Sequence, residues 1–181
     1  MAFNVSSFRS NMIGDGARPN LFEVSLNFPI FTDNAVAASQ QSTFMAKTAQ
    51  LPGSTIGVVP IYYFGREVKF AGNRSFADWT VQIINDESFL IRRAIEQWMN
   101  SINAHSGNIR SPLAATPSEY SVDAKVRQYG KAGNTLKQYN FVGMFPVDLA
   151  PIDLDWGQND SIEEYSVTFA YQYWTSDTTD N

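Results

Sequence analysis

Hydrophobic and polar residues alternate along much of the chain. Between residues 22 and 28, apolar side chains stand at every second position, with Glu, Ser and Asn between them. Residues 120–127 and 164–173 show the same period of two, which places apolar side chains on one face of a strand and polar ones on the other. Each pattern predicts an antiparallel strand with one buried face. Further predicted strands cover residues 43–51, 61–70, 79–85 and 136–144.

One segment has a helical period. Apolar side chains recur at i, i+3, i+4, i+7, i+8 and i+11 from Ile91 to Ile102, which is a single helical stripe. Asp86, Glu87 and Ser88 stand before this stripe, where capping side chains and negative charge are favourable. The spacing predicts an α-helix over residues 87–102 that packs its stripe against the sheet.

The remaining segments lack a period. Residues 32–42 are small and polar, and residues 104–118 contain Gly, Asn, Ser and two prolines, so both are predicted to be extended loops. The terminal segments 1–15 and 176–181 are polar and aperiodic, and we expect them to become ordered only on assembly. The whole pattern predicts a single domain over residues 1–181. Its expected fold class is mainly β, an antiparallel β-sandwich or barrel with one packed helix.

Composition narrows the function classes. Of the 181 residues, 44% are hydrophobic and 14% aromatic, which suits a packed core and not a disordered chain. The absence of cysteine excludes disulfides, thiolate metal sites and cysteine nucleophiles. A net charge of −5 is modest and disfavours an outer surface built to bind nucleic acid. Because no stretch has the length of an apolar membrane helix, we expect a protein that is soluble when made.

Residues that could carry catalysis or hold a metal are sparse. His105 is the only histidine and lies in a polar segment, which is typical of a solvated loop residue. Asp153 and Asp155 lie two apart and would share one face of an extended strand, but the ligand spacing of a helix–loop–helix calcium site is missing. Gly14 and Gly16 lack the third glycine of a dinucleotide-binding loop. We therefore predict no catalytic residue, no cofactor and no metal site.

Four tryptophans leave a carbohydrate- or ligand-binding β-sandwich open as an alternative of another class. The pairs Trp79/Trp98 and Tyr173/Trp174 fall on apolar faces, however, which favours core packing over a surface for stacking bases or sugars. An enzyme is a weaker interpretation of the sequence than a ligand-binding module.

Charged residues of opposite sign gather in two places. Lys125, Arg127, Lys131 and Lys137 lie on a predicted hairpin, whose connection is at residues 129–134, and residues 148–164 carry Asp and Glu without Lys or Arg. Ordinary solvated surface is one interpretation. The other is complementarity between neighbouring copies, which sets register more than affinity. Head-to-tail contacts of this kind generate rings or filaments.

Several ordered segments carry a resemblance to a known family. They are residues 16–24 (GARPNLFEV), 65–79 (GREVKFAGNRSFADW), 154–156 (LDW) and 167–174 (VTFAYQYW). In this order and spacing they resemble the tail tube proteins of T-even-type, contractile-tailed bacteriophages, over nearly the whole chain.

The resemblance implies a structural subunit and not an enzyme. It implies a β-barrel-like subunit that joins its strands to those of neighbours in a hexameric ring, and rings that stack head to tail into the inner tube of the virion tail. The implied partners are other copies of the chain and the sheath, baseplate, tape-measure and tube terminator proteins, with DNA only in transit through the lumen. Assembly is expected in the host cytoplasm. A tube of a secretion or toxin-delivery apparatus, which carries protein, is the alternative within this fold.

Ring closure removes exposed sheet edges, and the strands around a channel need one polar face. The strands expected there are residues 43–51, 61–70, 120–129 and 136–144. Their parity predicts five lumen-facing residues, which are Glu67, Lys69, Asp123, Lys125 and Arg127. Two Gly-containing segments are expected to reach an adjacent ring, through Thr55, Ile56, Gly57, Val58, Val59, Gly130, Lys131, Gly133 and Asn134.

Overall fold

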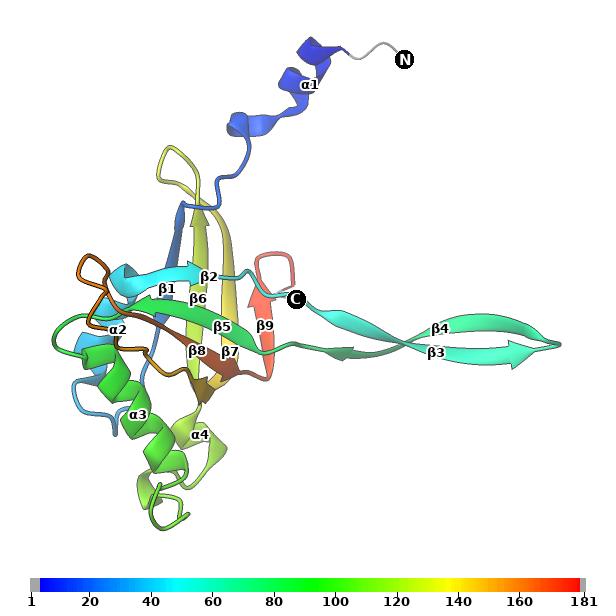
Figure 1. The fold of residues 1–181 in the computed structure, drawn as a ribbon. Helices are drawn as coiled ribbons and strands as arrows, with labels where there is room; N and C mark the ends of the chain where they lie inside the picture. Colours follow the sequence, from blue (N-terminus) through cyan, green and yellow to red (C-terminus); the bar gives the residue numbers. More distant parts are fainter. Residues whose placement is uncertain (1–3, 180–181) are drawn as a thin grey trace.

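The computed structural model describes residues 4–179, the side chain of Asp15 excepted (Figure 1). Its strands are β1 (Phe22–Leu26), β2 (Ala46–Ala49), β3 (Thr55–Tyr63), β4 (Arg66–Ser75), β5 (Trp79–Ile84), β6 (Val122–Tyr129), β7 (Thr135–Leu149), β8 (Glu164–Ala170) and β9 (Tyr173–Ser176). Its α-helices are α1 (Val5–Asn11), α2 (Ala35–Met45), α3 (Leu90–Ile102) and α4 (Pro117–Tyr120), and its 3-10 helices are η1 (Ile13–Asp15) and η2 (Pro112–Ala114). The mainly β, antiparallel class predicted from the sequence is confirmed.

All strands except β3 and β4 form one antiparallel sheet in the order β1-β6-β7-β8-β5-β2, with β9 paired to β7. The long strand β7 joins two halves, because its first part pairs with β6 and β9 and its residues 145–149 pair with β8. Strands of the two halves cross steeply, and the edge strands β1 and β2 approach each other (Figure 1). The sheet thus curls around its apolar face.

Aromatic side chains fill the space inside this curl. Trp79 of β5 stacks on Phe141 of β7 with 4.2 Å between ring centroids, and this contact joins the two halves. Trp98 of α3 is fully buried, and its ring centroid lies 6.3 Å from that of Phe169 of β8. The helical stripe predicted from Ile91 onward is buried against the sheet, and the helix begins three residues later than predicted.

The prediction of a loop at residues 32–42 is wrong, because α2 covers most of it. The sequence of this helix has no apolar stripe at helical spacing that would have predicted it. It buries two small residues four apart, Ala38 and Ser42, against β1, and the Ser42 hydroxyl accepts a hydrogen bond from the Leu26 amide at 3.2 Å. The strand predicted at residues 43–51 is shortened to β2 for the same reason.

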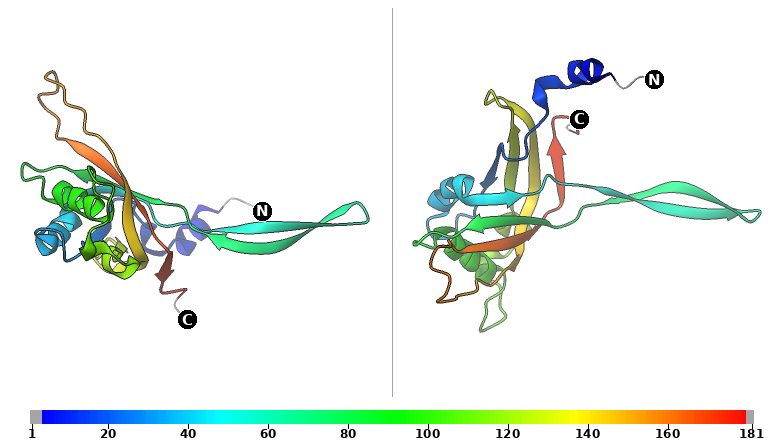
Figure 2. Two further views of the ribbon diagram at one scale, coloured as in Figure 1. Left: turned by 90° about the horizontal axis from the view of Figure 1, so that it is seen from below. Right: turned by 45° about the horizontal axis from the view of Figure 1, so that its top comes forward.

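The strand predicted at residues 61–70 is also wrong, because a tight turn divides it. Phe64 and Gly65 both have positive φ, as a two-residue type I′ turn requires, and they connect β3 to β4. These two strands form a separate hairpin, here called the arm, that projects from the body in every view (Figure 2). At the strand rise of about 3.4 Å per residue, the arm is roughly 30 Å long.

The remaining predicted segments show smaller differences. The strand predicted at 164–173 divides into β8 and β9, which pair with different parts of β7. Residues 104–118 are mostly irregular, apart from η2 and the start of α4. The first terminal segment holds α1 and η1, and β9 ends at Ser176 in the second. The expectation that these termini order on assembly also covers residues 1–3 and 180–181, which lie outside the described residues.

Candidate assembly and channel surfaces

Three of the five residues predicted to face a lumen lie together on β6. Asp123, Lys125 and Arg127 alternate with Ala124 and Val126, whose side chains are buried in the core, and therefore point to the other face of the sheet. The other two predicted lumen residues, Glu67 and Lys69, lie on β4 of the arm and are separate from this group.

The face around Lys125 and Arg127 is polar across three strands. We call it the first polar face, and its members come from β1, β6 and β7: Glu23, Ser25, Asp123, Lys125, Arg127, Gln138 and Asn140. Arg127 Nη1 donates to Glu23 Oε1 at 3.0 Å, and Arg127 Nε donates to Gln138 Oε1 at 2.7 Å. The Tyr129 hydroxyl donates to Glu23 Oε2 at 2.7 Å, and this hydrogen bond is the main cause that raises the pKa of Tyr129. Two acidic and two basic residues thus balance on this face.

The other half of the sheet has a polar face of its own, formed by β2, β5 and β8. Lys47 Nζ lies 2.5 Å from Glu164 Oε1, and Gln82 Nε2 donates to Glu164 Oε2 at 2.9 Å. Hydroxyl groups continue the surface, since Thr80 and Thr168 lie opposite each other with 3.1 Å between their oxygens. Charge is again balanced within the face.

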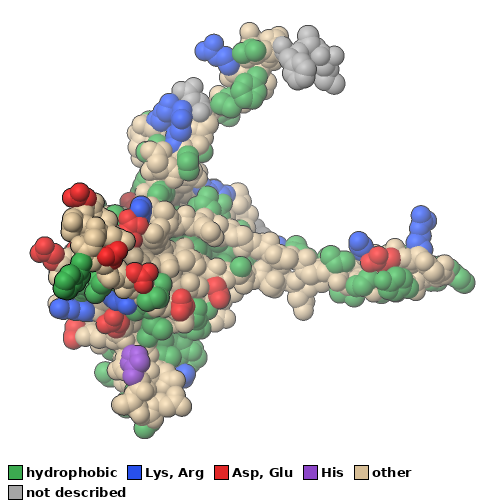
Figure 3. All heavy atoms as spheres, viewed as in Figure 1, with side chains coloured by type: hydrophobic (Ala, Val, Ile, Leu, Met, Phe, Trp, Pro, Cys, Tyr) green, Lys and Arg blue, Asp and Glu red, His purple; other side chains and the backbone are tan. Residues whose placement is uncertain are grey.

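The arm exposes hydrophobic side chains along one side. In the register of β3 with β4, Val59 faces Phe70 and Ile61 faces Val68, and all four side chains are exposed. On the opposite side, Lys69 and Glu67 interrupt the apolar residues. Figure 3 shows hydrophobic side chains along the arm with charged ones beside them. An isolated two-stranded hairpin is marginally stable in water, so this arm is typical of an element that packs on another chain.

The residues predicted to reach an adjacent ring lie in two separate places. Thr55 to Val59 form the first part of β3, where the arm leaves the body. A β-bulge follows Ile56, and a side chain on Gly72 would come within 3.0 Å of the Gly57 carbonyl oxygen, so the two strands approach closely there. Gly130, Lys131, Gly133 and Asn134 lie in the connection between β6 and β7, which is the hairpin connection predicted at residues 129–134, and all but Gly130 are exposed. Their contact with an adjacent ring stays a prediction.

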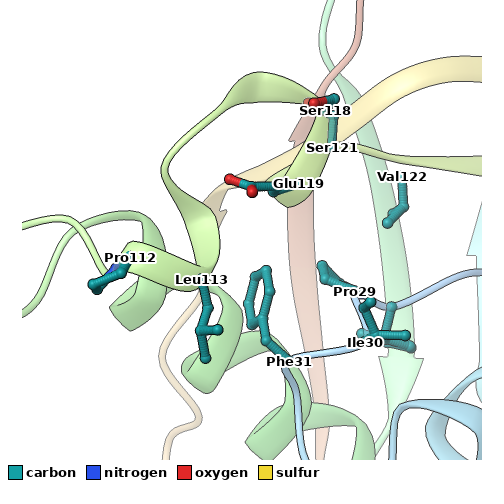
Figure 4. A pocket seen from close by; sticks show the side chains of 10 residues that line it. Pro29, Ile30, Phe31, Pro112, Leu113, Ser118, Glu119, Ser121 and Val122 are labelled. Atoms are coloured by element: carbon teal, nitrogen blue, oxygen red, sulfur yellow. The ribbon is translucent and has the colours of Figure 1, made fainter.

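Two further surfaces were not found by sequence reasoning. One is α1, which stands away from the body with Val5 and Phe8 exposed. The other is an apolar groove of about 770 Å³ whose walls include Phe31, Leu113 and Glu119 (Figure 4). The groove comes from segments without apolar periodicity, and α1 carries only a short apolar repeat, so no sustained signal marked either surface in the sequence.

The candidate chemical residues do not come together into a site. His105 is exposed, and its ring nitrogen Nδ1 lies 3.1 Å from Asn100 Oδ1, while Asp153 and Asp155 lie in the irregular segment between β7 and β8. Within residues 4–179, no three His, Asp or Glu side chains are grouped so that they could hold a metal ion. None of the helices in this part of the chain is long and apolar enough to cross a membrane.

Core packing of the aromatic pairs is confirmed in part. Trp79 and Trp98 are buried, and Trp174 packs against the core, where its indole nitrogen donates to the Gly53 carbonyl at 3.0 Å. Tyr173 is 46% exposed, so the prediction is wrong for this residue, because β9 turns its side chain outward at the edge of the sheet. Trp156 is fully exposed and also departs from the core-facing pattern expected of the tryptophans.

Comparisons with known proteins agree with this architecture. The family profile described as phage tail tube protein matches residues 17–177. The tail tube protein of Enterobacteria phage T4 is 35% identical over 162 residues, which cover 89% of this chain and 92% of the relative. The tail tube protein of Serratia phage KSP90 is 27% identical over 175 residues, or 96% and 97% of the two chains.

Among solved structures, a chain of the sheath–tube complex of an extracellular contractile injection system, PVC, has the same fold. Its TM-score is 0.60 at 14% sequence identity, over 97% of this chain and 98% of that chain. The match of the family profile to most of the chain, the identity to the T4 protein and the shared fold lead to one conclusion. The chain belongs to the phage tail tube protein family.

Proposed function

We propose that copies of this chain form hexameric rings that stack head to tail into the inner tube of a contractile phage tail, with the first polar face lining the channel. The tube is a structural part of the virion, enclosed by a sheath, nucleated at a baseplate around a tape-measure protein and closed by a terminator. DNA passes through the channel on its way to the host. No catalytic step is involved.

The observation that carries this proposal is the chemistry of the first polar face. One side of the β1–β6–β7 half is packed into the core, and the other carries the polar side chains of the first polar face, where Arg127 pairs with Glu23. A protein holds DNA by neutralising phosphates with excess Lys and Arg and releasing counterions. Since Arg127 is paired with Glu23 and Lys125 is balanced by Asp123, the face offers no such excess. A channel of this kind lets a polyanion slide without binding it.

The exposed side of the arm supports assembly. Its apolar residues remain in water in a single chain and would be buried by a neighbouring copy. Thr55 to Val59, predicted from the sequence to reach an adjacent ring, lie on this arm. Higher identity to phage proteins, at 35%, than to the injection-system chain, at 14%, favours DNA over protein as the cargo.

Negative-stain electron microscopy and native mass of the purified chain test the proposal. We expect hollow tubes or rings with sixfold end views as concentration rises. A chain that stays monomeric at all concentrations and specifically binds a sugar or another small ligand would refute it, and would support the ligand-binding module instead.

A further inference from the structure

The first observation concerns the exposed face of α1. Val5 and Phe8 within the helix and Met12 directly after it recur at i, i+3 and i+7, so they lie along one side. All three are exposed, Phe8 at 63% and Met12 at 44%. Arg9 stands beside this stripe and is the only charged residue among residues 4–14.

The second observation concerns the apolar groove. Phe31 and Leu113 form its walls, with Ile30 at the side, and both Leu113 and Ile30 are exposed. Glu119 lies at its rim (Figure 4). One oxygen of this carboxylate, Oε2, accepts from the Thr116 amide at 2.8 Å in the capping box of α4. Within residues 4–179, its other oxygen, Oε1, has no hydrogen-bond partner. The groove therefore offers an apolar surface with a negative charge at its edge.

The third observation is the placement of these two surfaces in the fold. The segment of α1 and η1 leads into the start of β1, beside the tip of the β6–β7 hairpin, where Met12 and Leu136 line one hollow. The groove begins where β1 ends, at residues 28–31, and where β6 starts, at Val122. The same strands therefore separate the two surfaces, which lie at opposite ends of the subunit (Figure 1).

We propose that α1 of one copy docks in the groove of the next copy along the tube, with Phe8 between Phe31 and Leu113 and Arg9 at Glu119. The inference rests on the proposed tube. A head-to-tail contact needs two different, complementary surfaces at opposite ends of a subunit, and repeating it extends a filament. The single positive charge of α1 meets the negative rim of the groove, which sets the register of the contact.

A chain without cysteine allows a direct test by disulfide cross-linking. We combine Phe8→Cys with Leu113→Cys, assemble tubes, oxidise them and separate the chains on a denaturing gel without reductant. The expected result is a ladder of covalently joined copies. A second pair, Val5→Cys with Leu113→Cys, keeps Phe8 and is expected to give the same ladder.

Matched controls separate docking from random contact. Ile162 is 71% exposed, close to the 66% of Leu113, but lies between β7 and β8 away from the groove, so Phe8→Cys with Ile162→Cys should give no ladder. Phe8→Cys alone should give no dimer, since a dimer means that α1 packs on another α1. In addition, Phe8→Ala should raise the critical concentration for assembly about 10-fold or more, from the loss of a buried Phe side chain, while Ser7→Ala leaves it unchanged.

The outcomes keep this inference distinct from the proposed function. The docking is overturned if both cysteine pairs form tubes but give no ladder, or if the Ile162 control gives an equal ladder. Either result leaves the proposed tube intact. An unmodified chain that never assembles overturns the tube and the docking with it.

Discussion

The same substitution, phenylalanine to alanine, separates folding from assembly when it is made at Phe141 and at Phe70. Phe141 is fully buried, stacks on Trp79 and meets Tyr171 edge-on with 4.9 Å between ring centroids. Truncating such a residue costs about 3–5 kcal/mol of unfolding free energy. For a domain of this size, that loss lowers Tm by roughly 6–20 °C.

Phe70 is 53% exposed on the arm and is not part of the core. Its truncation should change the unfolding free energy of the single chain by less than about 0.5 kcal/mol. If a neighbouring copy buries the exposed half of the ring, however, assembly loses about 1–1.5 kcal/mol per contact. This corresponds to a rise of about 5–10-fold in the critical concentration.

Two assays read these effects separately. Thermal unfolding of unassembled protein, followed by tryptophan fluorescence, measures the first, and sedimentation of polymer over a concentration series measures the second. We expect Phe141→Ala to shift mainly the unfolding curve and Phe70→Ala only the sedimentation curve. The reasoning is refuted by a Phe70→Ala chain that unfolds as early as Phe141→Ala, or that assembles at the concentration of the unmodified chain.

Further predictions concern the start of α3, the channel and the hairpin tip. The Ser88 hydroxyl donates to Asp86 Oδ2 at 2.6 Å and is the largest cause that lowers the pKa of Asp86. A carboxyl with a depressed folded pKa contributes stability above its unfolded pKa and loses it as pH falls through the folded value. Ser88→Ala should therefore lower the free energy of unfolding by about 1 kcal/mol at neutral pH and move acid unfolding to higher pH. Urea midpoints measured across the acidic range will test this, and an unchanged pH dependence contradicts it. In assembled tubes, the thiol of Lys125→Cys should react with a small maleimide but not with a maleimide coupled to a large polymer, which cannot enter the channel. The thiol of the control Arg93→Cys on α3 should react with both reagents. If the large reagent reacts equally at both positions, the channel assignment is wrong. Lys131→Glu reverses a charge expected to face the acidic segment of a neighbouring copy, so rings should form without stacking, and normal sedimentation of tubes removes this residue from the interface.

Where the burial of large apolar side chains decides the structure, the sequence predicts it well. The stripe that includes Ile91, Ile95 and Trp98 predicts α3, since a helix that packs one face on a sheet must repeat apolar residues at helical spacing. The alternation around Val24 and Val126 likewise predicts β1 and β6 and assigns Lys125 to the polar face. These elements follow from one local rule each.

Three features could not be predicted in the same way: α2, the arm and the apolar groove. In α2 the buried positions are Ala38 and Ser42, which give almost no hydrophobic signal. The turn at Phe64 and Gly65 interrupts an apolar run without Asn or Asp, so the two strands of the arm read as one. The groove joins residues near Phe31 to residues near Leu113, far apart in the chain, and only the fold brings them together.

A cryo-EM reconstruction of tubes assembled from the purified chain will show directly whether the first polar face lines a channel. We expect rings of six copies around an open channel, with Lys125 and Arg127 of every copy lining it. A solid filament, a ring of another symmetry, or a tube in which these residues lie on the outer surface would contradict it.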